Sequence, residues 1–192
     1  MTHGFYRLVP RTDATRAEVE AFIAKRYLDC YDAHINHFPD VLIAYYDVTK
    51  TLAAACGLRS HEEGLISDAY LPDDPATCVS RALGRPGQAS DLIEFTSLAA
   101  NRLDSLMHVL QAARDEARRR GKSLAIFTTT ELISRILRRQ KVKTIFLANA
   151  DETCAPGEGP WGDYYGPGTN VYVLPDDQAY AGDLFLQANK GH

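Results

Sequence analysis

The sequence has no long apolar run and no excess of basic residues. No segment approaches the roughly 18 consecutive apolar residues of a membrane-spanning helix, so we expect no spanning segment. Residues 1–7 lack the apolar stretch of a secretory signal, which favours a cytoplasmic protein. The formal net charge is −4, whereas a nucleic-acid-binding domain normally carries a basic face, so we expect no nucleic-acid partner.

Cysteine pairs and the short signatures of common enzyme classes are also missing. The sequence contains no C-x-x-C pair, P-loop, metal signature or catalytic triad. Cys30 and Cys56 lie among apolar residues, which favours free thiols in the core. His34 and His37 form an H-x-x-H pair, but no third ligand is near in the sequence, so we expect no metal. We also expect no tightly bound cofactor.

Length and composition are those of an ordinary globular protein. The chain has 192 residues, 45% of them hydrophobic and 24% charged, which is enough to bury a proper core. We therefore expect a single domain over residues 1–175. Residues 176–192 are expected to form a loosely packed C-terminal tail.

Apolar periodicity predicts alternating strands and helices. In the helix expected at 104–120, for example, Leu106, Leu110 and Ala117 fall on one face, and Gly121 follows the last turn. The predicted order is a strand at 5–10, a helix at 15–33, strands at 41–48 and 52–58, a helix at 76–83, a strand at 91–100, a helix at 104–120, a strand at 124–129, a helix at 131–139, and strands at 144–148 and 171–174. This order predicts an α/β (α+β) fold.

Glu94 stands out because it interrupts an apolar strand. Strand alternation places it on the same face as Leu92 and Thr96. A carboxylate in a core strand is unfavourable unless it is paired or functional. It would act either as a general base whose pKa is raised by burial, or as a structural carboxylate paired with an arginine. The sequence leaves both interpretations open.

Several segments in this order and spacing resemble one known family. They are Ile93–Ala99, the helix 104–120, Phe127–Thr130, the helix Leu132–Arg139, Leu147–Asp151 and the turn Trp161–Tyr165. Together they resemble the thermostable hemolysin family, a remote relative of the GNAT acyltransferases and the acyl-homoserine lactone synthases. The resemblance implies a GNAT-like mixed central sheet flanked by helices. Its central parallel strands, 91–100 and 124–129, would splay apart and admit an acyl-pantetheine.

The resemblance also implies an acyltransferase. It would move an acyl group from an acyl-CoA or acyl-carrier-protein thioester to an amine or hydroxyl acceptor. Glu94 would be the general base, and Tyr164 or Tyr165 would donate a proton to the departing thiolate or line an acyl tunnel. Typical GNAT enzymes follow the first splayed strand with a glycine-rich turn, which residues 101–106 lack. The nature of the acyl donor therefore stays open.

The remaining candidate residues follow from the same resemblance. Seven are assigned to the donor: Leu98, Ala99, Ala100, Arg102, Ser105, Thr128 and Thr129. Asn149 and Trp161 would contact the acceptor, although a residue like Asn149 at a strand end more often forms a turn, and packing is the favoured role of Trp161. A basic patch on the helix 131–139 and just after it would dock an acidic carrier protein, or would simply be solvated; it comprises Arg135, Arg138, Arg139 and Lys141.

Two other functions compete with the acyltransferase. The family name suggests a membrane-active cytolysin. The same fold would also serve a non-catalytic sensor of acyl thioesters. The substitution Glu94→Gln separates an enzyme from a sensor, because only an enzyme should lose turnover while it retains donor binding.

Overall fold

The computed structural model describes residues 4–155 and 160–176. The predicted tail 176–192 lies outside this range from position 177 onward. The strands are β1 (Phe5–Pro10), β2 (Val41–Tyr46), β3 (Leu52–Ser60), β4 (Leu92–Ala100), β5 (Leu124–Thr129), β6 (Ile145–Asn149) and β7 (Asn170–Pro175). The α-helices are α1 (Arg16–Tyr31), α2 (Pro75–Leu83), α3 (Leu103–Arg119) and α4 (Glu131–Arg139), and the short 3₁₀ helices are η1 (His61–Glu63), η2 (Ile66–Tyr70), η3 (Ala89–Asp91) and η4 (Glu152–Cys154).

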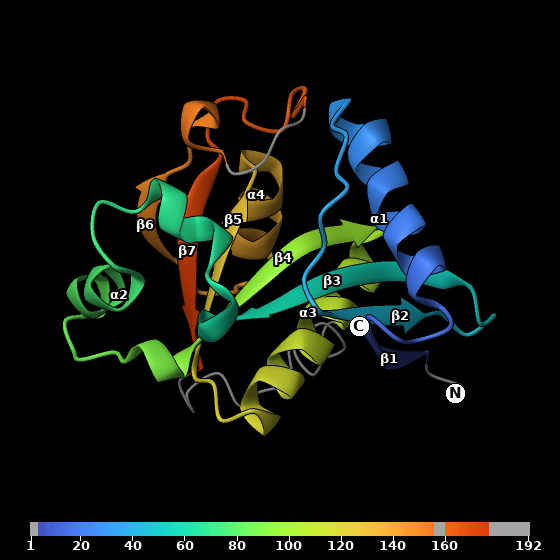
Figure 1. Cartoon of the computed structure of the whole chain (residues 1–192), viewed down its shortest axis with the longest axis horizontal. Coiled ribbons are helices and arrows are strands. Elements are labelled where there is room, and N and C mark those ends of the chain that lie inside the picture. Colours follow the sequence, from blue (N-terminus) through green and yellow to red (C-terminus); the bar gives the residue numbers. More distant parts are fainter. Residues whose placement is uncertain (1–3, 156–159, 177–192) are drawn as a thin grey trace.

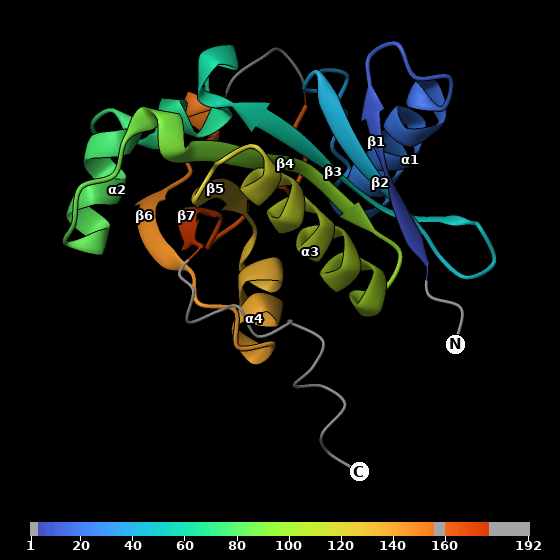
Figure 2. The same ribbon diagram turned by 90° about the horizontal axis from the view of Figure 1, so that it is seen from below.

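All the predicted strands and α-helices are present, with ends that differ by at most two residues. They form one seven-stranded mixed sheet in the order β1-β2-β3-β4-β5-β7-β6. Helices α1 and α2 pack on one face, and α3 and α4 pack on the other (Figure 2). The predicted GNAT-like sheet flanked by helices is therefore confirmed.

The two faces of β4 belong to different parts of the core. Leu92 packs with α2, whereas Ile93 and Phe95 pack with α3. Cys56 is buried as predicted. Cys30 is exposed, so its assignment to the core was wrong: helical spacing places it on the same face as Val19 and Ile23, but it lies in the last turn of α1, outside the buried clusters.

β4 and β5 separate after a short paired segment. Only Leu92–Glu94 pair with Leu124–Ile126, in parallel. Beyond Glu94, β4 continues along β3, and β5 continues along β7 (Figure 1). The predicted splay of the central parallel strands is therefore confirmed.

A β-bulge in β4 lies where the strands part. Ser97 and Leu98 together oppose the single residue Cys56 of β3. Ser97 adopts a φ of 50°, in the left-handed region that non-glycine residues seldom occupy. Gly57 keeps the strands close at this point, since a Cβ there would lie 2.9 Å from the Thr96 side chain. The bulge increases the bend of β4.

No helix within the described part of the chain is both long and apolar enough to cross a membrane.

Candidate active site

A cavity of about 350 Å³ lies where β4 and β5 part. It reaches both faces of the sheet, because its lining includes neighbours that point to opposite sides, such as Glu94 and Phe95. On the α1 face, the polar chamber includes Tyr27, Arg59, Tyr70, Glu94, Tyr164 and Tyr165. On the α3 face, the apolar chamber includes Met107, Leu110, Phe127, Ile133, Leu137 and Leu174, and the buried Arg114, which pairs with Asp176, also lines it.

Glu94 is 1% exposed and lines the polar chamber. Its carboxylate accepts hydrogen bonds from the Ile66 amide (2.7 Å) and the Ser67 amide (2.9 Å) at the start of η2. It also accepts a hydrogen bond from the Ser67 hydroxyl. A carboxylate offers about four acceptor positions, so these three hydrogen bonds leave one unused. Glu94 thus holds η2 in place and still faces the chamber.

The electrostatic setting of Glu94 combines opposing effects. Burial raises the pKa of its carboxyl group, while the hydrogen bonds from Ser67 and Ile66 lower it, and the charge of Arg59 lowers it further. Burial dominates, so the pKa lies above its ordinary value. A carboxylate with a raised pKa is a stronger base than an exposed one.

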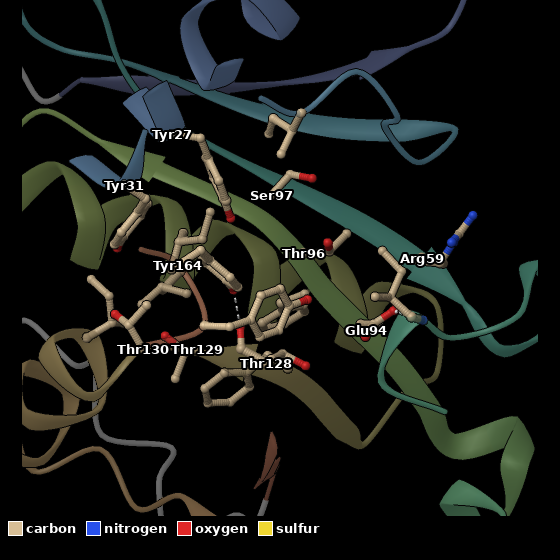
Figure 3. Close-up of a pocket in the computed structure, with 18 of the residues that line it drawn as sticks. Tyr27, Tyr31, Arg59, Glu94, Thr96, Ser97, Thr128, Thr129, Thr130 and Tyr164 are labelled. Carbon is tan, nitrogen blue, oxygen red and sulfur yellow. Dashed lines mark hydrogen bonds between the residues drawn. The ribbon is translucent and has the colours of Figure 1, made fainter. Parts of the chain in front are cut away.

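Arg59 is the direct cross-strand partner of Glu94, from the end of β3. Figure 3 shows the two residues at one end of the cavity, with Tyr31 and Thr130 at the other. The Nε atom of Arg59 is buried, and no group in residues 4–155 or 160–176 hydrogen bonds to it. The chamber therefore contains a cation whose hydrogen-bonding capacity is incompletely used.

An aromatic cluster closes the opposite side of the polar chamber. The turn Trp161–Tyr165 packs on the end of α1. Gly162 lies so close to this helix that a Cβ there would be 2.0 Å from the Tyr31 carbonyl oxygen. Tyr164 stacks on Tyr27 with ring centroids 5.6 Å apart. The rings of Tyr164 and Tyr165 meet edge to face at 5.0 Å. The turn thereby joins α1 to the mouth of the splayed strands.

The tyrosine hydroxyls are directed at the strand edge and at one another. Tyr164 donates a hydrogen bond to the Thr128 carbonyl at 3.2 Å, and Tyr165 is hydrogen bonded to Tyr70. Burial raises the pKa of both Tyr164 and Tyr165. Both hydroxyls therefore stay protonated at neutral pH.

Sequence comparison matches residues 9–179 to the family described as thermostable hemolysin. The chain belongs to the thermostable hemolysin family. Among curated proteins, none matches the sequence.

Solved structures with the same fold as this thermostable hemolysin family member share little sequence with it. FeeM, an N-acyl amino acid synthase from uncultured soil microbes, superposes with a TM-score of 0.65 at 10% identity, covering 98% of this chain and 99% of that one. TofI, in a ternary complex with an inhibitor and MTA, gives 0.63 at 15% identity over 95% and 96%. BjaI, a CoA-dependent acyl-homoserine lactone synthase with SAM and isopentyl-CoA, gives 0.63 at 8% identity over 98% and 91%.

Seven of the twelve predicted site residues of this family member line the cavity. They are Glu94, Leu98, Thr128, Thr129, Trp161, Tyr164 and Tyr165. Their convergence depends on the splay, because Leu98 belongs to β4 and Thr128 to β5. The assigned chemical roles stay predictions.

The other five lie outside the cavity lining. Ala99 is buried with α1, and Ala100 lies at the end of β4. Arg102 is exposed and pairs with Asp104 at 3.3 Å. Ser105 is buried in α3, and Asn149 is exposed at the end of β6. Their assignments to donor and acceptor likewise stay predictions.

The predicted carrier-docking patch lies on the exposed side of α4. Arg135 pairs with Glu131 of the same helix at 2.5 Å. Arg138, Arg139 and Lys141 are exposed. The patch is accessible to a partner, and docking of a carrier protein stays a prediction.

Sequence reasoning missed several polar residues of the cavity, as well as Ser67, which hydrogen bonds to the cavity residue Glu94. Arg59 follows the apolar run of β3 and gives no local signal of its partner. Ser67 and Tyr70 come from η2, in a region whose periodicity is irregular. Arg114 is 5% exposed within α3 and pairs with Asp176 at 3.2 Å, and a buried arginine on an otherwise apolar helix face was the one signal available.

Proposed function

We propose that this protein is an acyltransferase that moves an acyl group from a pantetheine thioester to an amine or hydroxyl acceptor. A single observation supports this most: one cavity joins an apolar chamber to a polar chamber through the parted strands. An acyl chain would occupy the apolar chamber, and the acceptor would occupy the polar one. The thioester carbonyl would then lie between them.

The edge of β4 suits an extended pantetheine arm. Beyond Glu94, the backbone groups of β4 that face β5 have no strand partner there. Unpaired backbone amides and carbonyls require hydrogen-bonding partners, and the amides of pantetheine would add to β4 as a strand does. Either acyl-CoA or an acyl carrier protein would present such an arm.

The reaction needs the transfer of a proton and the alignment of two reactants. Glu94 would take a proton from the acceptor, whose nitrogen or oxygen then attacks the thioester carbonyl. The C–S bond breaks, and the hydroxyl of Tyr164 or Tyr165 would protonate the leaving thiolate. Most of the rate gain would come from holding the reactants together in the cavity.

The test is turnover with panels of acyl-CoA and acyl-carrier-protein donors and of amine and alcohol acceptors, followed by mass spectrometry and by thiol release. If the acyl chain of the donor fills the apolar chamber, each added methylene contributes about 0.8 kcal/mol, or about fourfold in kcat/KM. Octanoyl donors should therefore surpass acetyl donors by more than a hundredfold. Failure to bind any pantetheine donor would overturn the proposal.

A matched pair of variants ties that preference to the cavity. Leu110→Trp fills the apolar chamber and should abolish the advantage of long chains. Leu28→Trp alters a 42% exposed leucine of α1 and should leave the advantage intact. Dye leakage from liposomes without a donor would instead support the cytolysin, and donor binding without turnover would support the sensor.

A further inference from the structure

Arg59 has a buried hydrogen-bond donor to which the proposed acyl transfer assigns no role. Its Nε atom is buried without a hydrogen-bonding partner in the described residues, and its side chain lines the polar chamber. Buried donors in native proteins are almost always satisfied, so a persistent exception beside a cavity calls for an explanation. A ligand in the chamber would supply the missing acceptor.

The neighbouring carboxylate does not fill this role. Glu94 lies directly across the strand pair from Arg59, yet its oxygens accept hydrogen bonds from the backbone of η2 at 2.7 and 2.9 Å. The Ser67 hydroxyl occupies a further position on Glu94. The carboxylate is thereby turned toward η2, and the Nε of Arg59 keeps its donor for a second anion.

We propose that Arg59 binds a carboxylate of the acceptor, and that the acceptor is therefore an amino acid or a similar amino carboxylate. The proposal rests on the acyltransferase function proposed above. A guanidinium presents parallel N–H groups that match the two oxygens of a carboxylate. Directly opposed strand residues have Cβ atoms about 5 Å apart, so a small molecule held by Arg59 has its amine within reach of Glu94.

The phosphates of the donor are a poorer match for this cation. Arg59 and Glu94 lie where β4 and β5 are still paired, at the closed end of the parted strands. The open end of β4 is at Ala100, six residues further and roughly 20 Å away. A thioester arm that enters between the parted strands keeps its phosphate-bearing head at that open end.

The chemical step balances for such an acceptor. The ammonium group gives one proton to Glu94 and becomes a neutral amine. Its nitrogen attacks the thioester carbonyl, so a C–N bond forms and the C–S bond breaks. The second proton lost by the nitrogen is matched by the proton that the leaving thiolate gains. The products are an N-acyl amino acid and a free thiol.

Acceptor competition in the unaltered protein tests the proposal first. With a donor that supports turnover, each amino acid is compared with its amide and with its decarboxylated amine. We expect the carboxylate to raise kcat/KM by about 100-fold or more, because a site built to bind a group rejects analogues that lack it. Equal rates with the decarboxylated amine would overturn this inference while leaving the acyltransferase standing. Faster turnover of phosphoethanolamine or taurine would replace the carboxylate with another anion and would also overturn it.

Two variants and a binding measurement complete the design. Arg59→Ala and Arg59→Lys should raise KM for the amino acid at least tenfold and flatten its preference over the decarboxylated amine, with donor binding unchanged. Thermal shift by the amino acid, but not by its amide, gives a readout independent of turnover, and both Arg59 variants should lose it. If the shift occurs and no donor supports turnover, the proposed acyl transfer fails while the carboxylate site stands. If neither amino acid nor amide shifts the melting point and turnover ignores the carboxylate, the site is refuted.

Discussion

Removal of the Ser67 hydroxyl separates the two roles that the geometry gives to Glu94. Ser67 is fully buried, and its side chain and amide both donate to the Glu94 carboxylate. Ser67→Ala leaves the amide bonds from residues 66 and 67 and deletes one hydrogen bond to a charged group. Such a bond contributes about 1.5–3 kcal/mol, so the free energy of unfolding measured in urea should fall by about 1.5 kcal/mol or more.

The same variant should change the pH dependence of the reaction. The Ser67 hydroxyl is the largest of the groups that lower the pKa of Glu94, so its loss moves that pKa further upward. A general base works in its ionised form, and the acid limb of kcat/KM should therefore move to higher pH. The hydrogen bond that is lost stabilises only the ionised form of Glu94. Its loss should therefore lower kcat/KM about tenfold on the acid limb, whereas kcat/KM on the plateau should hardly change.

A second serine provides the control. Ser80 of α2 accepts a hydrogen bond from the Gly87 amide at 2.8 Å and lies outside the cavity lining. Ser80→Ala should lower stability without moving the acid limb. An acid limb that stays in place in Ser67→Ala, despite the stability loss, would show that Glu94 acts only as a structural cap for η2.

Two further predictions concern the framework around the cavity. Gly162→Ala should lower the melting temperature far more than Gly64→Ala. Both glycines have a positive φ, but only at position 162 would the added carbon meet a backbone carbonyl, at 2.0 Å. Equal falls in melting temperature would refute the close packing of the turn on α1. Asp176→Asn should destabilise the protein at pH 7 by about 1 kcal/mol, since Arg118 and Arg114 lower the pKa of the partly buried Asp176. The extra stability of the wild type over Asp176→Asn is fully present above the unfolded-state pKa of the carboxyl group, and it should shrink as pH falls through the lower folded-state pKa. Urea titrations at several pH values measure this difference, and a difference that grew on acidification would contradict the prediction.

Local pattern was sufficient for the elements but not for the contacts between them. Alternation along 92–96 predicted that Glu94 shares a face with Leu92, and its 1% exposure agrees with an inward position. The hydrogen-bonding partners of Glu94 come from residues 66 and 67, which lie more than 25 positions earlier in a stretch without periodicity. The two interpretations that the sequence left open for Glu94 also overlap in the structure, because the carboxylate is a structural cap and a cavity residue at once.

The position of Arg59 shows why the site itself could not be read from the sequence. In β3 and β4, Ala55 pairs with Ala99, yet Gly57 pairs with Thr96, because the bulge inserts one extra residue between them. A regular ladder continued from the Ala55–Ala99 pair would place Phe95 opposite Arg59. Since a slip of one residue turns every side chain to the other face, Glu94 would then point at α3, away from η2 and from the tyrosines. The bulge depends on a serine in the left-handed region, where sequence patterns favour glycine or asparagine, so the feature that brings a cation and a carboxylate into one chamber leaves no signature in the sequence.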